Sequence, residues 1–402
     1  MLSNTNRPLR IAIAGCGPAG LSAAIALHRD GHRVELFDQL EVPAPIGSGL
    51  LIQPTGLAVL ENLGLREALE QRGNRIDRLR GVAVPGGRTA LDVSYESLPH
   101  APYAVAVHRS TLFDVLFEAV RECAIPVHTG FRVTGLTRDS TNGWQLQGEG
   151  GQTSAAVDWI IDALGVNSPL AGSPPKPLNF GALWATLNWP DDGRFMPTRL
   201  EQRYRRARIM VGVLPIGQIR GDPQRKVTFF WSLKRDAYGS WRKHDLDAWK
   251  DEVREVWPQT DCLLEQIDTH EQLVFANYAH RTLAKPYAPG LAHIGDGAHS
   301  TSPQLGQGAN MALLDSDALR TALKHAGEPQ KASVIYADMR RRHVRLYQAM
   351  SLGFTPAFQS NGWLLPALRD FGFSPLSRIP GVRRLLASVV AGLLVRPVKP
   401  LS

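Results

Sequence analysis

The sequence contains few cysteines and no long apolar run, and both absences narrow the class of protein. Its 402 residues include three cysteines, Cys16, Cys123 and Cys262, which lie far apart without a CxxC pair or zinc-ligand spacing. This usage predicts reduced thiols in a cytoplasmic protein, because disulfide frameworks and zinc modules need suitably spaced cysteines. No run of about eighteen apolar residues occurs, so we expect no transmembrane helix.

Motifs for several other protein classes are also absent. The net charge of +8 raises nucleic acid or an anionic membrane as partners. No RNA-binding motif, zinc-finger spacing or lysine-rich tail accompanies that charge, so we expect no nucleic-acid partner. Residues 11–27 are apolar enough to resemble a signal peptide, but glycines interrupt them and no cleavage pattern follows, so we expect none. Residue spacing reveals no Ser-His-Asp array, paired-carboxylate motif or metal cluster.

The first forty residues carry a dinucleotide-binding fingerprint in its full context. Residues 9–14 predict a buried strand, residues 21–29 a helix and residues 33–37 a second strand, with GCGPAG at 15–20 joining the first two. In this pattern Gly15 permits the tight turn, Gly17 lets the backbone approach a pyrophosphate and Gly20 allows close helix–strand packing. Asp38 ends the second strand, where it can accept hydrogen bonds from an adenosine ribose. The context favours a bound dinucleotide over a mere glycine-rich turn.

A second glycine-rich stretch, residues 291–319, organises the rest of the chain. A short apolar strand reaches Gly295-Asp296-Gly297, and Pro303 and Gly306-Gln307-Gly308 then lead into a helix. A glycine-rich loop that opens a helix leaves backbone N–H groups unpaired, which favours an anion or an electron-rich ligand edge. Taken alone, the stretch leaves open the alternative of a tight connection with a capping aspartate.

The segments between these stretches predict a second domain. Residues 44–55 predict a loop close to the ligand, and it includes Gly49. Arg109 follows a predicted strand at 103–107 and opens a helix, and at this junction we expect it to reach the cofactor. Aromatic, β-rich segments at 181–189, 208–214 and 226–233 predict an inserted antiparallel sheet, covered by helices at 246–256 and 261–267. Its aromatic residues are core candidates, and one face is also a candidate wall for a ligand cavity.

The last eighty residues predict helices at 331–352, 363–371 and 382–395. The apolar run at residues 385–395 is too short to cross a bilayer. We therefore expect a helix packed on the body or at a dimer contact, with an interfacial membrane helix as the alternative.

Three separated segments together resemble the class A, single-component FAD-dependent aromatic monooxygenases, the para-hydroxybenzoate hydroxylase-like group. They are GCGPAG at 15–20, DALGVNS at 162–168 and IGDGAHSTSPQLGQGAN at 294–310, and the chain from residue 346 is similar to the ubiquinone-biosynthesis hydroxylases. The resemblance covers nearly the whole chain. It implies an α/β fold with a discontinuous, Rossmann-like FAD-binding domain of the GR2 type (residues 1–75, 101–175 and 287–340). It also implies an inserted antiparallel-sheet substrate domain (76–100 and 176–286) and a C-terminal helical region (341–402).

The same resemblance implies where the cofactor lies. The three fingerprint glycines would meet the FAD pyrophosphate, Asp38 the adenosine ribose and Asp296 the ribityl chain. Arg109 would lie beside the cofactor, Pro303 would border the flavin on the substrate side, and the backbone of residues 308–310 would face the pyrimidine edge of the ring. The implied cofactor-binding residues are Gly15, Gly17, Pro18, Ala19, Gly20, Asp38, Gly49, Arg109, Asp296, Pro303, Gly306, Gly308, Ala309 and Asn310.

The implied activity is insertion of one oxygen atom from O2 into a hydrophobic, aromatic small molecule by a flavin hydroperoxide. NAD(P)H is the expected electron donor, but Leu164 stands where the family usually has aspartate and Gln39 where it often has arginine. An external reductant therefore stays open. His108 and His299 are candidate bases for a phenolic substrate, but His299 is expected to be structural, and no catalytic base is assigned. A reductase or dehydrogenase on the same scaffold, and a flavin-binding partner protein, remain the alternatives. Peripheral membrane association remains open beside the cytoplasmic location.

Overall fold

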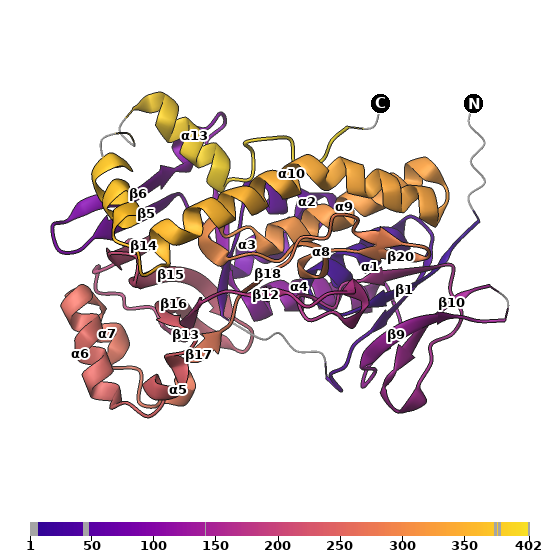
Figure 1. Cartoon of the computed structure of the whole chain (residues 1–402), viewed down its shortest axis with the longest axis horizontal. Helices are drawn as coiled ribbons and strands as arrows, with labels where there is room; N and C mark the ends of the chain where they lie inside the picture. Colours follow the sequence, from indigo (N-terminus) through magenta and orange to yellow (C-terminus); the bar gives the residue numbers. More distant parts are fainter. Residues whose placement is uncertain (1–6, 43–47, 141, 374–375, 377–378, 401–402) are drawn as a thin grey trace.

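The computed structural model describes residues 7–42, 48–140, 142–373, 376 and 379–400, and it contains two large sheets joined by long helices (Figure 1). The first sheet has the order β19-β20-β11-β1-β2-β8, and its pairs are parallel except β19–β20. Its strands are β1 (Arg10–Ala14), β2 (Arg33–Phe37), β8 (Val127–His128), β11 (Trp159–Asp162), β19 (Tyr287–Ala288) and β20 (Leu291–His293).

Helices cover one face of this sheet, and the pair β9 (Val133–Arg138) and β10 (Trp144–Gly148) covers the other, as its continuous apolar strands require. Residues 11–14 of β1 are fully buried. The helices α1 (Pro18–Arg29) and α4 (Arg109–Glu122) pack together, and α1 also packs on α9 (Gly308–Ala326), which lies against the long helix α10 (Pro329–Phe358). Because β1, β11 and β20 run parallel, their carboxyl ends meet at one edge, where ligands bind in folds of this type.

A small three-stranded sheet lies beside the first. It consists of β3 (Gly49–Ile52), β7 (Ala104–His108) and β4 (Asn74–Ile76), and it is followed along the chain by α2 (Pro54–Asn62) and α3 (Arg66–Arg72). The loop expected over residues 44–55 is wrong from residue 49 onward. Residues 49–52 form a strand because they pair with β7, more than fifty positions later in the chain. Residues 44–47 lie outside the described part of the chain.

The second large sheet has seven strands in the order β17-β13-β16-β15-β14-β5-β6. All neighbouring pairs are antiparallel except β14–β5, which is parallel. The strands are β5 (Arg78–Ala83), β6 (Arg88–Ser94), β13 (Phe180–Asn188), β14 (Arg199–Arg205), β15 (Ile209–Ile219), β16 (Asp222–Lys234) and β17 (Val274–Ala276). The sequence did not predict β14, whose alternating charged residues hide its strand pattern.

The two faces of this sheet have different neighbours. Phe229 and Trp231 pack against α5 (Tyr238–Trp241), α6 (Leu246–Val256) and α7 (Asp261–Leu264). Because side chains alternate along a strand, Phe230 lies on the opposite face, with Trp184 and Tyr204. The aromatic residues therefore form a core on one side and leave a second apolar face on the other. Smaller pairs are β9 (Val133–Arg138) with β10 (Trp144–Gly148), and β12 (Lys176–Pro177) with β18 (Ala279–His280).

The C-terminal region begins inside α10, which continues without a break through the expected domain boundary at residue 340. It continues with α11 (Leu364–Leu368), the π-helical turn η7 (Arg369–Phe373) and α13 (Pro380–Val390). The helix expected to reach residue 395 ends at Val390, because Gly392 adopts φ +81° and donates its N–H to the Val389 carbonyl. None of the helices in the described ranges is both long and apolar enough to cross a bilayer.

Candidate functional site

Three loops, two of them glycine-rich, meet at the carboxyl edge of the parallel sheet. The Gly15 N–H donates to the Phe37 carbonyl at 2.7 Å, and a Cβ on Gly15 would lie 2.5 Å from the Ala163 carbonyl oxygen. A Cβ on Gly295 would lie 3.1 Å from the Ala19 Cβ. The loops after β1, β11 and β20 are therefore in direct contact, and segments about 140 residues apart in the sequence form one site.

Two helices begin at this site with their N-terminal N–H groups uncapped by side chains. Gly17 is the N-cap of α1, whose first helical residue is Pro18, and Gln307 is the N-cap of α9. Neither helix has a side-chain cap or an acidic residue in its first turn. Helix starts of this kind carry partial positive charge and favour an anion or an electron-rich edge.

Open space lies in front of both helix starts. A Cβ added at Gly17 or at Gly308 would meet no atom within 4 Å, whereas a Cβ at Gly20 would lie 1.9 Å from the Gly15 carbonyl oxygen. The fingerprint glycines therefore have two different roles. Gly20 permits close packing inside the protein, and Gly17 leaves room for a ligand.

Two carboxylates accompany these loops. The Asp38 carboxylate accepts hydrogen bonds from the backbone N–H of Cys16 and of Leu40, both at 2.9 Å. The Asp296 side chain is exposed, yet the surrounding protein raises its pKa by desolvation while His299 and Arg109 act to lower it. Asp296 directly follows Gly295, which contacts Ala19 in the first turn of α1, and its side chain is exposed. We call the open space in front of the two helix starts the recess.

The loop before α9 is held in place by side-chain hydrogen bonds. Asn310 is fully buried, and its amide accepts from the Gln53 N–H at 2.8 Å and donates to the carbonyls of Leu51 and Gly306, both at 3.0 Å. Ser302, beside Pro303, lies 2.7 Å from the Thr355 hydroxyl of α10. The Asn310 side chain therefore holds the loop in place, while the Asn310 backbone lies at the start of α9.

Buried polar atoms without partners surround the same loop. Among the described residues, Gln53 Nε2, Gln304 Nε2 and Ser300 Oγ have no hydrogen-bond partner. A Cβ on Gly306, which adopts φ +60°, would lie 3.9 Å from Gln53 Nε2. Buried donors normally find a partner, so these atoms fit a ligand that offers carbonyl or ring-nitrogen acceptors.

A buried charge cluster supports the Gly295–Asp296 turn from below. The Gly295 N–H donates to Asp315 Oδ2 at 2.8 Å, His299 Nε2 lies 2.6 Å from the same oxygen, and Arg340 Nε donates to Asp315 Oδ1 at 2.8 Å. Burial alone would raise the pKa of Asp315, but His299 and Arg340 lower it to about 2. His299 is buried in this cluster, which agrees with the structural role expected for it.

Asp162, at the end of β11, forms a second buried cluster. Its Oδ2 accepts from the Ser168 hydroxyl at 2.6 Å and lies 2.7 Å from His293 Nδ1, and its Oδ1 accepts from the Leu164 N–H at 3.0 Å. The carboxylate therefore fixes the loop that carries Leu164. Sequence reasoning assigned no role to Asp162 or His293, although a charged residue inside the apolar run WIIDA was a usable signal.

The face of the seven-stranded sheet that lies opposite α6 carries a cluster of aromatic residues, which we call the aromatic wall, and Phe358 of α10 packs against part of it. The Trp184 and Phe230 rings lie 4.6 Å apart between centroids, and Trp184 Nε1–H donates to the Tyr278 hydroxyl at 2.9 Å. Burial raises the pKa of Tyr278 to about 12, and Arg109 lies close enough to act in the opposite direction. Arg109 also acts to lower the pKa of Asp296, so one guanidinium is electrostatically coupled to both side chains.

Gly49 joins the two parts of this site. Its N–H donates to the Thr228 hydroxyl at 3.1 Å, and a Cβ on Gly49 would lie 2.4 Å from that oxygen. The sequence named Gly49 as a cofactor residue and kept one face of the aromatic sheet, which carries Trp184 and Phe230, as a candidate wall beside the core interpretation. It did not single out Tyr278, which lies between β17 and β18.

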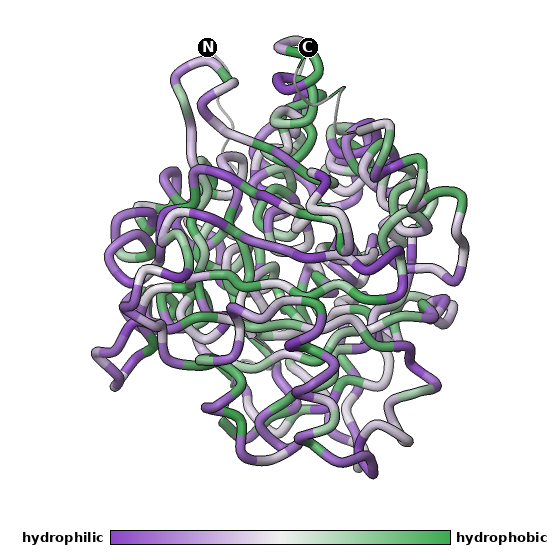
Figure 2. The backbone as a smooth tube through the Cα atoms, turned by 90° about the vertical axis from the view of Figure 1, so that its left-hand side faces the viewer, coloured by the Kyte–Doolittle hydropathy of each residue, from purple (hydrophilic) through white to green (hydrophobic). Residues whose placement is uncertain are grey.

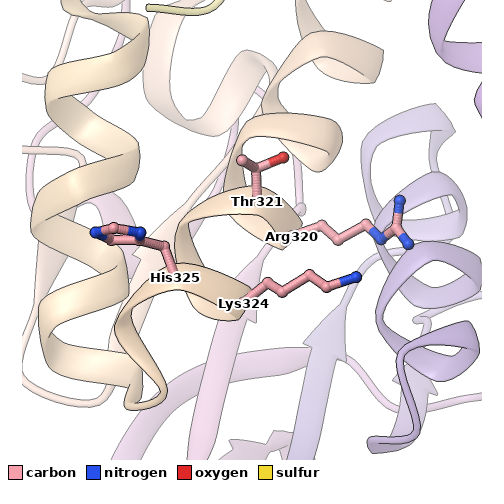
Figure 3. A pocket seen from close by; sticks show the side chains of 4 residues that line it. All are labelled: Arg320, Thr321, Lys324 and His325. Atoms are coloured by element: carbon pink, nitrogen blue, oxygen red, sulfur yellow. The ribbon is translucent and has the colours of Figure 1, made fainter. Parts of the chain in front are cut away.

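Two hollows lie outside the recess. One of about 310 Å³ is lined by Arg320, Thr321, Lys324 and His325 near the end of α9 (Figure 3), roughly 18–25 Å along the helix from Gly308. Arg320 there pairs with Asp30 at 2.6 Å, so this hollow is separate from the site. The other, about 780 Å³, lies between residues 177–180, 234–236 and 355–361. Thr355 on its wall bonds Ser302, which places the cleft beside the loop that carries Pro303.

Comparisons with known proteins agree with this geometry. Residues 9–345 match the family described as FAD binding domain. The chain is 26% identical over 403 residues to the 6-methylpretetramide 4-monooxygenase of Streptomyces rimosus, covering 95% of this chain and 92% of that one. It is 28% identical to the 3-amino-4-hydroxybenzoate 2-monooxygenase of Streptomyces cremeus, covering 83% of this chain and 84% of the relative.

Solved structures show the same fold. The Klebsiella pneumoniae HpxO protein, complexed with FAD and uric acid, superposes with a TM-score of 0.80 at 18% identity, covering 96% of this chain and 98% of that one. A tetrameric 2-methyl-3-hydroxypyridine-5-carboxylic acid oxygenase superposes with a TM-score of 0.78 at 20% identity, covering 96% of each chain.

Proposed function

The chain belongs to the FAD binding domain family and is an FAD-dependent monooxygenase, and from this premise we propose that the recess between the three loops holds the cofactor and the aromatic wall holds the substrate. The observation that carries this proposal is the open space at Gly17 and Gly308, in front of two uncapped helix starts. One bound ligand would account for the candidate residues lying together, whereas a glycine-rich turn without a ligand would not require them to do so.

The residues present fit FAD along its whole length. The α1 start at Gly17–Gly20 suits the pyrophosphate, since unpaired N–H groups there favour negative charge. Asp38 suits the adenosine ribose, and Asp296 suits the ribityl hydroxyls because its exposed side chain follows Gly295, which contacts the first turn of α1. The α9 start at residues 308–310 suits the pyrimidine edge of the ring, and the unpartnered Gln53 and Gln304 amides lie near the same loop.

FAD, once bound and reduced, supplies the oxygen-transfer chemistry, and the chain supplies position, charge and exclusion of water. The α9 helix start favours the negative charge that a reduced ring carries. Trp184 and Phe230 give an apolar surface that orients an aromatic ring and keeps water away. Tyr278, with its pKa near 12, stays protonated at neutral pH and can donate a hydrogen bond to a substrate oxygen.

The substrate class that fits this wall is a hydrophobic aromatic molecule with at least one polar ring substituent. The relatives' names specify a pretetramide and an aminohydroxybenzoate, both of them aromatic compounds. We assign the 780 Å³ cleft beside Thr355 as the approach route, because its wall is hydrogen-bonded to Ser302 next to Pro303.

NAD(P)H is the proposed electron donor, with an external reductant as the competing source. Leu164 lies half-buried against the β9–β10 pair, and the nearby carboxylate of Asp162 is already occupied by Ser168 and His293. We therefore expect slow reduction by NADH and NADPH in the absence of substrate. Anaerobic mixing with each nucleotide, followed by the loss of flavin absorbance, measures this directly.

Three coarser features complete the proposal. We retain the division into an FAD-binding domain, a substrate domain with residues 76–100 and 176–286, and a C-terminal region. We propose a reducing, cytoplasmic environment, because Cys16, Cys123 and Cys262 are all unpaired. We also propose that the C-terminal helices make a peripheral contact with a membrane or a second subunit.

The test of the function is turnover with a panel of hydroxylated aromatic and heteroaromatic acids and hydrophobic polycyclic phenols. The purified protein, loaded with FAD, should consume O2 and NAD(P)H in the presence of one class and release a product heavier by one oxygen atom. Tight binding of several panel members without any oxygenated product, under any electron donor including dithionite-reduced flavin, would contradict the proposal.

A further inference from the structure

The C-terminal region carries an unusual concentration of exposed apolar side chains. Of the fourteen large hydrophobic residues that are exposed in the described part of the chain, nine lie between residues 363 and 393. Trp363 is 73% exposed and Phe371 62%. The nine, which we call the C-terminal apolar face, are Trp363, Leu364, Leu365, Leu368, Phe371, Leu376, Ile379, Leu385 and Leu393.

The segments that carry this face are attached to the same part of the protein. Both η7 and α13 contact strand β6, and the Arg88 guanidinium of β6 lies 4.3 Å from the centre of the Phe371 ring. Figure 1 shows α13 projecting at the edge of the molecule beside β6, and in Figure 2 hydrophobic stretches reach the top of the view beside the C-terminus label. Monomeric proteins rarely expose such a concentration of apolar residues without a partner.

The inner sides of η7 and α13 are fixed to the rest of the protein by hydrogen bonds and buried apolar contacts. Arg369 is buried and donates to the carbonyls of Ala357 and Arg206, at 2.8 Å and 3.0 Å. In α13, Ala387 and Val390 are buried against the protein. Each segment therefore has one face that holds it to the body and one apolar face that is left uncovered.

The charge of this region is strongly one-sided. From residue 363 to the end, the sequence has six lysines and arginines and one carboxylate, Asp370, and that carboxylate pairs with Arg369 at 2.8 Å. Arg383, Arg384 and Arg396 are exposed beside the apolar face. A second copy of the chain docking through the same face would bring arginines against arginines, whereas an anionic lipid surface matches both the charge and the apolar side chains.

We propose that the C-terminal apolar face docks on an anionic lipid bilayer, with α11 and α13 lying in the headgroup region and their arginines contacting lipid phosphates. Two signals act together, apolar insertion and positive charge, as stable membrane anchoring requires. The face is also linked to the site, because Gln307 Nε2 beside Gly308 donates to the Val390 carbonyl of α13 at 2.6 Å. Docking itself does not depend on the proposed function. Its consequence does, namely that a hydrophobic substrate reaches the enzyme from the membrane.

Flotation of the FAD-loaded full chain with vesicles tests the docking without any turnover. The protein should float with vesicles that contain phosphatidylglycerol, should stay at the bottom with phosphatidylcholine alone, and should be released by high salt. The double charge reversal R383E/R384E should weaken partitioning at least about 30-fold, because each cation near an anionic surface contributes a factor of about five. A second variant, W363S/L368S, should weaken it through the apolar term alone.

Matched controls use exposed residues elsewhere. Arg242-Lys243 is another pair of adjacent exposed cations, and Val274 is 52% exposed on the seven-stranded sheet. The variants R242E/K243E and V274S should float like the parent protein, and flavin absorbance in each sample reports an intact site. If the parent does not float, or if both test variants float like it, the proposal is overturned. A concentration-dependent dimer that W363S/L368S abolishes, without flotation of the parent, would assign the face to a second copy instead.

Discussion

Replacing Gly308 with alanine should separate the stability of the apoprotein from its affinity for FAD. Gly308 is the first residue of α9, and a Cβ there would meet no atom within 4 Å. Alanine has a higher helix propensity than glycine by up to about 1 kcal/mol, so the apoprotein should be at least as stable as the parent. For a chain of this size that gain raises Tm by about 1 °C or less.

The same methyl group occupies space that we assign to the edge of the flavin ring. Backbone N–H groups hold a ring edge only when the two are in close contact, so a methyl displaces the ring and lengthens those hydrogen bonds. We expect the Kd for FAD to rise at least about tenfold, which corresponds to about 1.4 kcal/mol. A substitution that stabilises the empty protein while weakening FAD binding is hard to explain unless the empty space is ligand space.

Gly353→Ala is the matched control for this experiment. Gly353 lies in α10, is exposed, and also has no atom within 4 Å of an added Cβ. It should raise apoprotein stability similarly and leave FAD affinity unchanged. The assay is titration of each apoprotein with FAD, read by flavin fluorescence, beside thermal unfolding without FAD. If G308A binds FAD as tightly as G353A does, the assignment of the α9 helix start to the ring is refuted.

Three further substitutions examine the other parts of the site. Asp296→Asn should stabilise the apoprotein at neutral pH. Because the pKa of the Asp296 carboxyl is raised, the parent loses stability as pH rises through that pKa, so the advantage of the variant should vanish below about pH 3.8, while its affinity for FAD should fall. A variant that is less stable than the parent at every pH would contradict the placement of Asp296 in the recess. Asp315→Asn should lower the free energy of unfolding, measured with denaturant, by about 3–5 kcal/mol, because the buried Arg340 loses its carboxylate partner. In the parent, the stability that the ionised Asp315 contributes should disappear as pH falls from about 3.8 towards 2. Tyr278→Phe should retain FAD and raise the substrate Kd about 3- to 10-fold, the value of one hydrogen bond; loss of FAD instead would place Tyr278 in the cofactor site.

The sequence predicted the loops that we assign to the cofactor because the pattern that marks them is local. Gly15, Gly17, Gly20 and Asp38 lie within one strand–helix–strand unit, where spacing alone determines the geometry. The helices and strands of that unit were predicted to within a few residues, since their apolar runs are buried on both faces.

The rest of the site depends on contacts that the sequence does not display. Asp315 and Arg340 lie 25 positions apart on two helices, and only their packing reveals that they hold the Gly295 turn. Trp184 and Tyr278 lie 94 positions apart, and nothing in their local pattern distinguishes a pocket wall from a core. The strand at residues 49–52 was mistaken for a loop for the same reason, because its partner is distant.

We propose that the recess binds FAD and that the bound flavin transfers one atom of O2 to an aromatic substrate at the aromatic wall. The most direct measurement is turnover of the FAD-loaded protein under isotopically labelled 18O2, with mass spectrometry of the product. We predict one 18O atom in each product molecule, and none when apoprotein is used or when the gas is unlabelled. A product that gains its oxygen from water, or that is oxidised without gaining oxygen, would contradict the account.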